Sequence, residues 1–209
     1  MPFTIPDKLT FKKTVVDETM FSSIFEQNLK TIVACTYFKP DDDTLLKAII
    51  QVRKLAQQKH VKSLVFLADT HSCSNIRFIS TDIPTAQRLY LKALRIGIQD
   101  KEIAGHVYFR LYRIFEALKE TNTAIIFLKE AAKLDLSKAW VHLSMLDTRP
   151  NASREFLKKA CKLNNEVAIR EAYGRDIIPL EKLYKYTVEN ESLILRDVLK
   201  NVTCLSAGL

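Results

Sequence analysis

The side chains best suited to chemistry lie in one polar segment, residues 69 to 82, which contains the string Thr-His-Ser-Cys-Ser-Asn. A thiol acts as a nucleophile only where a neighbouring base lowers its pKa and so populates the thiolate. Only Ser72 separates His71 from Cys73, which is too short a spacing to aim the imidazole at the thiol. We therefore interpret this segment as a polar loop, in preference to a catalytic or metal site.

Metal and nucleotide sites have little support elsewhere in the chain. His106 and His142 lie near the expected starts of helices, where a packing or surface role is commoner than metal binding. The chain contains no Walker loop and no G-x-G-x-x-G, H-E-x-x-H or G-x-S-x-G string. We expect a protein that is not an enzyme and that holds no metal and no cofactor.

The cysteines indicate a reducing environment. They lie far apart in the sequence, at Cys35, Cys73, Cys161 and Cys204. Because no two of them form a C-x-x-C pair, a zinc ribbon and a disulfide-rich secreted fold are both disfavoured. The first residues also lack the basic tip and long apolar core of a secretory signal. We therefore expect an intracellular protein, in the cytoplasm or the mitochondrial matrix.

Length and composition favour one folded domain and an acidic partner. A chain of 209 residues, of which 47% are hydrophobic, can bury a sizeable core. No run of about eighteen apolar residues is present, so no membrane span is expected. The net charge of +8 favours an acidic protein face, RNA or an anionic lipid surface as partner. A basic surface that is simply solvated is the alternative.

A helical pattern recurs through the chain, most clearly from Thr85 to Leu94 and just beyond. Small residues and one large residue fall at i, i+4, i+7 and i+11, which places them on one stripe of an α-helix. The small residues admit a neighbouring helix, and the large residue fills the space beside it. Four copies can be aligned: Ala86, Tyr90, Ala93 and Gly97; Ala124, Leu128, Ala131 and Asp135; Ala152, Phe156, Lys159 and Leu163, with Ala160 one place late; and, most loosely, Leu180, Tyr184, Thr187 and Glu191.

Recurrence of such a helix predicts an all-α fold, a right-handed α-α superhelix (solenoid) of stacked antiparallel helical hairpins. Residues 61 to 68 are rich in β-branched side chains, but we predict a helix because a lone strand in a helical stack has no partner. We expect a single domain over residues 1–209. Its parts are an irregular arm at 1–16, N-terminal helices at 17–60, hairpins at 61–191, and a capping helix with a tail at 192–209.

Two amphipathic helices are predicted before residue 60. The first runs from about Asp17 to Phe38 and ends before Pro40, which disfavours helical backbone in the preceding residue. The second follows the aspartates at positions 41 to 43, whose carboxylates suit an N-cap and first turn, and runs from Thr44 to about His60. Its buried face is expected to comprise Leu45, Ala48, Ile49, Val52 and Ala56.

The opposite face of this second helix is basic and is the candidate docking surface. Between Asp43 and Asp69 the chain has no acidic residue, so nothing nearby in the sequence neutralises its cations. The candidate docking residues are Lys47, Gln51, Arg53, Lys54, Gln58 and Lys62. A secondary basic cluster is formed by Arg154, Lys158, Lys159 and Lys162. For both sets the alternative is a solvated helix face.

The hairpins resemble the Sel-one-like (Sel1-like) subfamily of tetratricopeptide-type repeats over about residues 61 to 191. In that family the second helix of a hairpin carries Ala-x-x-Trp-Tyr-x-Lys-Ala-Ala-x-x-Gly. The matching residues are Leu89-Tyr90 and Lys92-Ala93 in the first copy, Phe127-Leu128 and Lys129-Glu130-Ala131-Ala132 in the second, and Phe156 and Lys159-Ala160 in the third. Most terminal glycines of the family pattern are missing, so we expect the turns at Asp135, Asn164 and Asn165.

The resemblance implies a non-catalytic scaffold or adaptor that helps to assemble protein complexes. Together with the basic charge, it leads us to expect another protein with an acidic face as the partner. Trp140, the only tryptophan, is interpreted as a packing residue, with an exposed anchor for a partner as the alternative. RNA or the ribosome is the alternative partner, because helical repeats can bind RNA through Lys and Arg.

Overall fold

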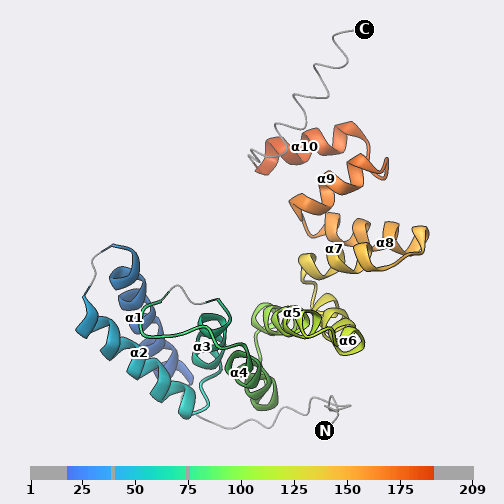
Figure 1. The fold of residues 1–209 in the computed structure, drawn as a ribbon. Coiled ribbons are helices and arrows are strands. Elements are labelled where there is room, and N and C mark those ends of the chain that lie inside the picture. The colour runs from blue at the N-terminus through green and yellow to red at the C-terminus, as the bar shows by residue number, and fades with distance from the viewer. Residues whose placement is uncertain (1–17, 39–40, 74–75, 191–209) are drawn as a thin grey trace. The chain divides into compact units, whose positions relative to one another are not determined.

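The computed structural model describes residues 18–38, 41–73 and 76–190, and every regular element in these ranges is an α-helix (Figure 1). The all-α prediction is therefore confirmed, including a helix where residues 61 to 68 had a strand-like composition. In chain order the helices are α1 (Glu18–Tyr37), α2 (Asp42–Gln57), α3 (Val61–Ser72), α4 (Ile83–Ile96), α5 (Lys101–Ala117), α6 (Thr121–Lys133), α7 (Ser137–Leu146), α8 (Pro150–Lys162), α9 (Glu166–Gly174) and α10 (Leu180–Asn190).

The chain divides into two compact units, Met1–Glu120 and Thr121–Leu209. Within the first unit α1 packs on α2, α2 on α3, α3 on α4, and α4 on α5. Within the second unit α6 packs on α7, α7 on α8, α8 on α9, and α9 on α10. Each unit is thus built from helices that pack against their neighbours in the chain, as the hairpin pattern predicts. None of the described helices is long and apolar enough to cross a membrane.

Aspartates begin three helices of the first unit. Asp41 accepts hydrogen bonds from the backbone N–H and the hydroxyl of Thr44, at 3.3 and 2.6 Å. Asp82 accepts hydrogen bonds from the backbone N–H and the hydroxyl of Thr85, at 3.0 and 2.6 Å. Asp100 accepts from two backbone N–H groups at the start of α5. These side chains satisfy donors that have no partner inside the helix, which stabilises a helix by about 1 kcal/mol each.

The buried stripes follow the repeat pattern in its first two copies. The third copy is wrong by one position, because Ser153, Leu157 and Ala160 are buried, whereas Ala152 and Phe156 are half-buried and Lys159 and Leu163 are exposed. Ala93, Ala131 and Ala160, the small residues expected at helix crossings, all have an exposed fraction of 0%. The large residues of the first two copies, Tyr90 and Leu128, are equally buried. In α2 the predicted buried face is also confirmed. The core of the second unit around α8 to α10 consists of Val141, Leu157, Ala160, Cys161, Ala168, Ile169, Ala172, Ile178 and Leu183.

Five turns between helices repeat one backbone geometry without glycine. The residues with left-handed backbone that close them have φ between 53° and 67° and are Lys59, Lys119, Asp135, Asn164 and Asp176. In each case the next N–H donates to a carbonyl five residues earlier, as Leu136 does to Ala131 at 3.2 Å. This is the long hydrogen bond of a Schellman motif. The turns predicted at Asp135 and Asn164 are confirmed, and Asn165 is the N-cap of α9.

The loosest copy of the repeat pattern is wrong in register. Leu180 and Tyr184 are exposed by 40% and 61%, whereas Leu183 is fully buried and Tyr186 packs against the core. Leu183 and Tyr186 lie one helical turn apart, so they share the side of α10 that faces α9. The side chain of Thr187 and all of Glu191 lie outside the described residues.

Four other expectations are not tested by the described residues. The arm at 1–16 and the capping helix at 192–209 lie outside the described ranges. The right-handed sense of the superhelix and the single domain over 1–209 stay predictions.

Candidate protein-interaction surfaces

The outer face of α2 is basic, and its cations form no ion pair with any residue that the structure describes. Lys47, Arg53 and Lys54 are exposed, while Lys62, at the start of α3, is half-buried. Among the residues that the structure describes, none of these four has a carboxylate within 4 Å. Gln51 and Gln58 are exposed between them. The candidate docking surface predicted from the sequence is therefore presented to solvent as a set of unpaired positive charges.

The acidic residues of α2 and its N-cap lie at the start of the helix. Asp42 pairs with Arg77 at 2.5 Å, and both side chains are about half exposed or more. The pKa of Asp41 is lowered, first by the hydrogen bonds from Thr44 and to a smaller extent by the charge of Lys47. The acidic residues of α2 are thus confined to its first turn, where they complement the helix dipole.

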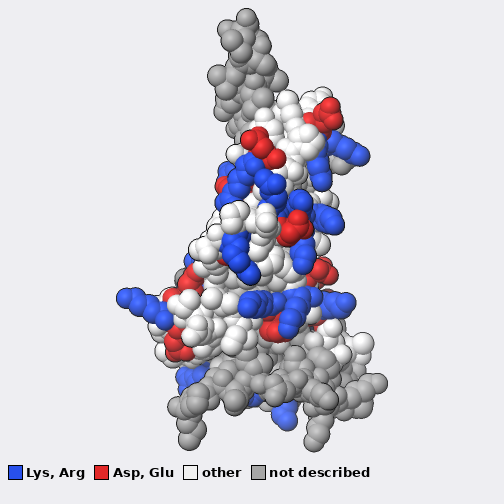
Figure 2. Space-filling model, turned by 90° about the vertical axis from the view of Figure 1, so that its right-hand side faces the viewer, with Lys and Arg blue, Asp and Glu red and all other residues white. Residues whose placement is uncertain are grey.

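The secondary basic cluster on α8 is different, because Lys158 and Lys159 have partners. Lys158 lies 3.0 Å from Glu155, and the pKa of Glu155 is lowered by its hydrogen bond with Lys158 and by the lysine charges around it. Lys159 places its ammonium 4.3 Å from the centre of the Trp140 ring, within cation–π range. Figure 2 shows Lys and Arg mixed with Asp and Glu on the described surface turned toward the viewer. This part of the cluster is not an unbalanced patch of positive charge.

Trp140 packs in the second unit. It is partly buried against the core, and its ring lies 5.6 Å from that of Phe156. The interpretation of Trp140 as a packing residue accounts for these contacts, and the ammonium of Lys159 lies over the ring.

Asp69 is the centre of a polar cluster that the sequence did not reveal. Its carboxylate accepts a hydrogen bond of 2.6 Å from the hydroxyl of Tyr90 in α4. His106 Nε2 in α5 lies 2.8 and 3.0 Å from its two oxygens, and Arg110 Nε lies 3.2 Å from one of them. One carboxylate in α3 thus ties together three consecutive helices. We call Asp69, Tyr90, His106 and Arg110 the Asp69 cluster.

The chemistry of the Asp69 cluster is that of a structural ion pair. Burial favours the protonated form of Asp69, but hydrogen bonds from His106 and Tyr90 and the charge of Arg110 favour the carboxylate, so its pKa lies below its ordinary value. Burial and the adjacent carboxylate raise the pKa of Tyr90. Both groups therefore keep one protonation state at neutral pH, which suits a fixed contact between helices better than proton transfer.

The segment expected to be a polar loop is partly helical. α3 continues through Ser72, so Asp69, Thr70, His71 and Ser72 belong to a helix, and the loop interpretation is wrong for these residues. His71 Nδ1 lies 3.0 Å from the carbonyl oxygen of Ser80, while the thiol of Cys73 donates to the carbonyl of Asp69 at 3.4 Å. The imidazole and the thiol therefore have separate partners. In the described chain no three His, Cys, Asp or Glu side chains are grouped as metal ligands.

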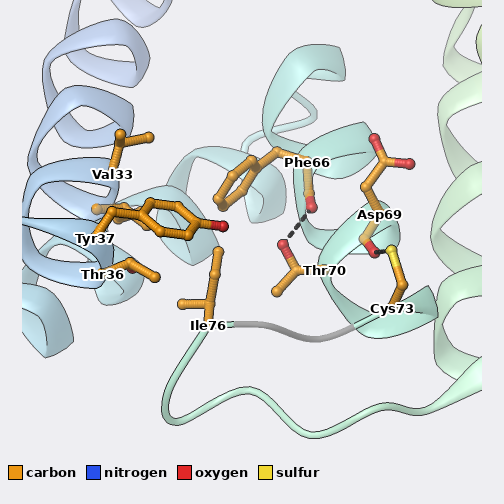
Figure 3. A pocket seen from close by; sticks show the side chains of 9 residues that line it. Val33, Thr36, Tyr37, Phe66, Asp69, Thr70, Cys73 and Ile76 are labelled. Atoms are coloured by element: carbon orange, nitrogen blue, oxygen red, sulfur yellow. Dashed lines mark hydrogen bonds between the residues drawn. The ribbon is translucent and has the colours of Figure 1, made fainter.

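A pocket of about 220 Å³ lies between α1 and α3, as Figure 3 shows. Tyr37 and Val33 of α1 face Phe66 of α3 across it. Its lining is mostly carbon and comprises Ile32, Val33, Thr36, Tyr37, Phe66, Asp69, Thr70, Cys73 and Ile76. Val33 and Tyr37 are 40% and 61% exposed, so the pocket opens beside apolar side chains that face solvent.

Comparison with known proteins supports the fold. The chain is similar in structure to a Sel1 repeat protein from Oxalobacter formigenes, with a TM-score of 0.63 and 15% sequence identity, over 87% of this chain and 75% of that chain. No protein-family model matches the sequence, and no curated protein matches it. The chain thus has a Sel1-repeat-like fold of helices packed as sequential hairpins, as the sequence resemblance implied.

Proposed function

We propose that this protein is a non-enzymatic scaffold or adaptor that binds an acidic face of another protein through the basic surface of α2. The observation that carries the proposal is that Lys47, Arg53 and Lys54 are exposed and have no ion-pair partner among the described residues. The Sel1-repeat-like fold adds support, because stacked helical hairpins present extended surfaces suited to binding other proteins.

The burial of α2 dictates which side chains face outward. Leu45, Ile49 and Val52 are each 0% exposed, so their side of the helix is fixed against the rest of the first unit. At 100° per residue, this orientation turns Lys47 and Lys54 toward solvent. With no acid beyond the first turn of α2, the potential over this face is positive. Such a surface raises the encounter rate with an acidic partner more than it raises the final affinity.

Reversing two of these charges should slow complex formation. We expect Lys47→Glu with Lys54→Glu to reduce the association rate constant by roughly tenfold or more at low salt, because electrostatic steering is lost. The difference should shrink as salt is raised, since screening removes the attraction from the wild type as well. Association kinetics of the purified protein with its partner, measured across a salt series, check this expectation.

A matched control is available in the same unit. Lys92 in α4 and Lys101 in α5 are exposed and have no ion-pair partner among the described residues, so Lys92→Glu with Lys101→Glu changes the net charge equally. The control should keep association within about threefold of wild type, apart from the general effect of net charge. Equal slowing by both pairs would show that overall charge, and not the α2 surface, directs binding.

RNA is the second candidate partner, favoured by the net charge of +8. Binding of RNA releases counterions, so the logarithm of its affinity falls linearly and steeply with the logarithm of salt concentration. A protein partner held mainly by packing loses far less affinity in the same series, because added salt screens only the charged contacts. The salt dependence of equilibrium affinity therefore separates the two candidates.

The absence of catalysis is also testable at the residues best suited to it. We expect His71→Ala with Cys73→Ala to retain the cellular function of the wild type, because the two side chains bond to different backbone carbonyls. Complementation of a deletion strain by the double variant, with circular dichroism to verify folding, is the measurement. A folded double variant that fails to complement would argue for a catalytic role.

A further inference from the structure

A second pocket, with polar walls, lies in the second unit where α8 begins and α9 ends. Its volume is about 260 Å³, and the side chains that line it are Pro150, Asn151, Ser153, Arg154, Arg175 and Ile177. Two of these are arginines, and none is a carboxylate. A cavity bounded by two guanidinium groups and no acid is expected to bind an anion.

The two arginines differ in their hydrogen bonds to the rest of the protein. Arg154 is exposed at the pocket and has no hydrogen bond or ion pair with any described residue. Arg175 is oriented by Ser153, whose hydroxyl accepts a hydrogen bond of 3.2 Å from Arg175 Nη1 and donates one of 2.6 Å to the carbonyl of Ser144. Ser153 is only 7% exposed, so it acts as a fixed support. Glu171 lies 3.7 Å from Arg175, on the side of α9, and is not part of the lining.

The start of α8, where Asn151 lines the pocket, has backbone donors without acceptors in the described chain. Its N-cap residue, Arg149, makes no side-chain capping hydrogen bond, and Pro150 at the first helical position has no N–H. The N–H groups of Asn151 and Ala152 then have no acceptor among the described residues. The adjacent carboxylate of Asp147 is occupied by Arg149, through its backbone N–H and its guanidinium. The start of α8 and two arginines therefore place donors at a pocket whose lining contains no carboxylate.

We propose that this pocket binds a phosphomonoester. A phosphomonoester carries a charge of about −1.5 to −2 at neutral pH, which favours it at a pocket where Arg154 has no described partner and the carboxylate of Glu171 lies 3.7 Å from Arg175. A carboxylate or a phosphodiester carries only one negative charge, so its attraction to the two guanidinium groups is weaker. Three terminal phosphate oxygens also match the number of donors at the pocket better than the two oxygens of a carboxylate. The volume exceeds that of the phosphate group alone, and Ile177 offers an apolar wall to the group that carries it.

This proposal goes beyond the adaptor role and is independent of it. The pocket belongs to the second unit, whereas the basic surface of α2 belongs to the first. Different variants therefore alter the two sites, and binding to each is measured with a different ligand. The proposal also distinguishes Arg154 from Lys158 and Lys159, with which it was grouped in the sequence, because Glu155 pairs with Lys158 and Trp140 contacts Lys159.

The test is titration of the full ¹⁵N-labelled chain with inorganic phosphate and with phosphoserine at about 0.15 M salt. We expect both to shift the amide resonances of Asn151 and Ala152. Acetate and dimethyl phosphate should bind at least about tenfold more weakly, because they carry one charge. Tighter binding of phosphoserine than of phosphate would identify a phosphorylated side chain as the ligand, and equal binding would identify free phosphate. Equal binding of dimethyl phosphate would overturn the proposal.

Variants make the assignment specific to the pocket. Arg154→Gln should weaken phosphoserine binding about tenfold or more, as expected for loss of a charge-assisted hydrogen bond. Arg170→Gln is the matched control, because Arg170 is exposed on α9, does not line the pocket, and its replacement removes the same charge. The control should bind like wild type. Equal weakening by both variants, or no weakening by Arg154→Gln, would contradict a binding site at this pocket.

Discussion

Replacing Asp69 with alanine is expected to destabilise the first unit by about 2–4 kcal/mol. The change leaves the buried hydroxyl of Tyr90 and the charged group of Arg110 without their acceptor, and hydrogen bonds to charged groups contribute about 1.5–3 kcal/mol. Breaking a fully buried ion pair costs about 3–5 kcal/mol, but the Asp69 side chain is 30% exposed, so solvent screening reduces the effect. Urea denaturation with separate probes for the two units measures the loss.

An exposed aspartate provides the control for this variant. Asp42 pairs with Arg77, and the two side chains are 59% and 48% exposed. Exposed pairs contribute about 0–1 kcal/mol, so Asp42→Ala should cost less than about 1 kcal/mol. If Asp69→Ala were no more destabilising than Asp42→Ala, the Asp69 cluster would not hold α3, α4 and α5 together.

The carboxylate of Asp69 also makes the free energy of unfolding depend on pH in the acidic range. Because the pKa of Asp69 is lower in the folded state than in the unfolded chain, its contribution is fully present above the unfolded value of about 3.9. That contribution is lost as the pH falls through the folded pKa. Asp69→Asn should therefore differ most from wild type at neutral pH and converge with it in strong acid.

Replacing Ala131 with leucine is expected to cost roughly 1–3 kcal/mol by overpacking the second unit. Ala131 is 0% exposed in α6, and its carbonyl accepts the long hydrogen bond from Leu136 that closes the turn before α7. Three added carbon atoms have no free volume there, so neighbouring side chains must leave their preferred rotamers. Thermal unfolding of the variant should begin at a lower temperature than that of wild type.

The control for Ala131→Leu makes the same chemical change on a surface. Ala34 in α1 is exposed, so Ala34→Leu should alter stability by no more than about 0.5 kcal/mol. An Ala131→Leu protein that unfolds like wild type would mean that the small residue is not required where two helices cross. The repeat pattern would then have been assigned to the wrong stripe.

The helical stripes could be predicted because they depend on residues close together in the chain. Ala86, Tyr90 and Ala93 recur at helical spacing, and a buried stripe follows from that spacing alone. Where two stripes compete within one short helix, spacing does not decide: in α10, Leu180 and Tyr184 fit the pattern, yet Leu183 is the buried residue. Packing against α9 selects the stripe, and that information lies outside the helix.

The Asp69 cluster was missed for a related reason. Asp69 stands in a polar string that is typical of a loop, and its partners lie 21 to 41 residues further along the chain. One local signal existed, because His106 and Arg110 are four residues apart and so share a face of α5. That spacing predicts a common partner but does not identify it. The basic residues of α2 could be predicted as exposed because the buried face of the same helix is clear.

The most direct test of the adaptor proposal is affinity purification of three proteins from the native source, each with and without nuclease. The three are wild type, Lys47→Glu with Lys54→Glu, and the control Lys92→Glu with Lys101→Glu. We expect wild type and the control to retain the same protein partner after nuclease treatment, and the α2 variant to lose it. A partner retained by the α2 variant, or lost by wild type on nuclease treatment, would contradict an adaptor that binds protein through α2.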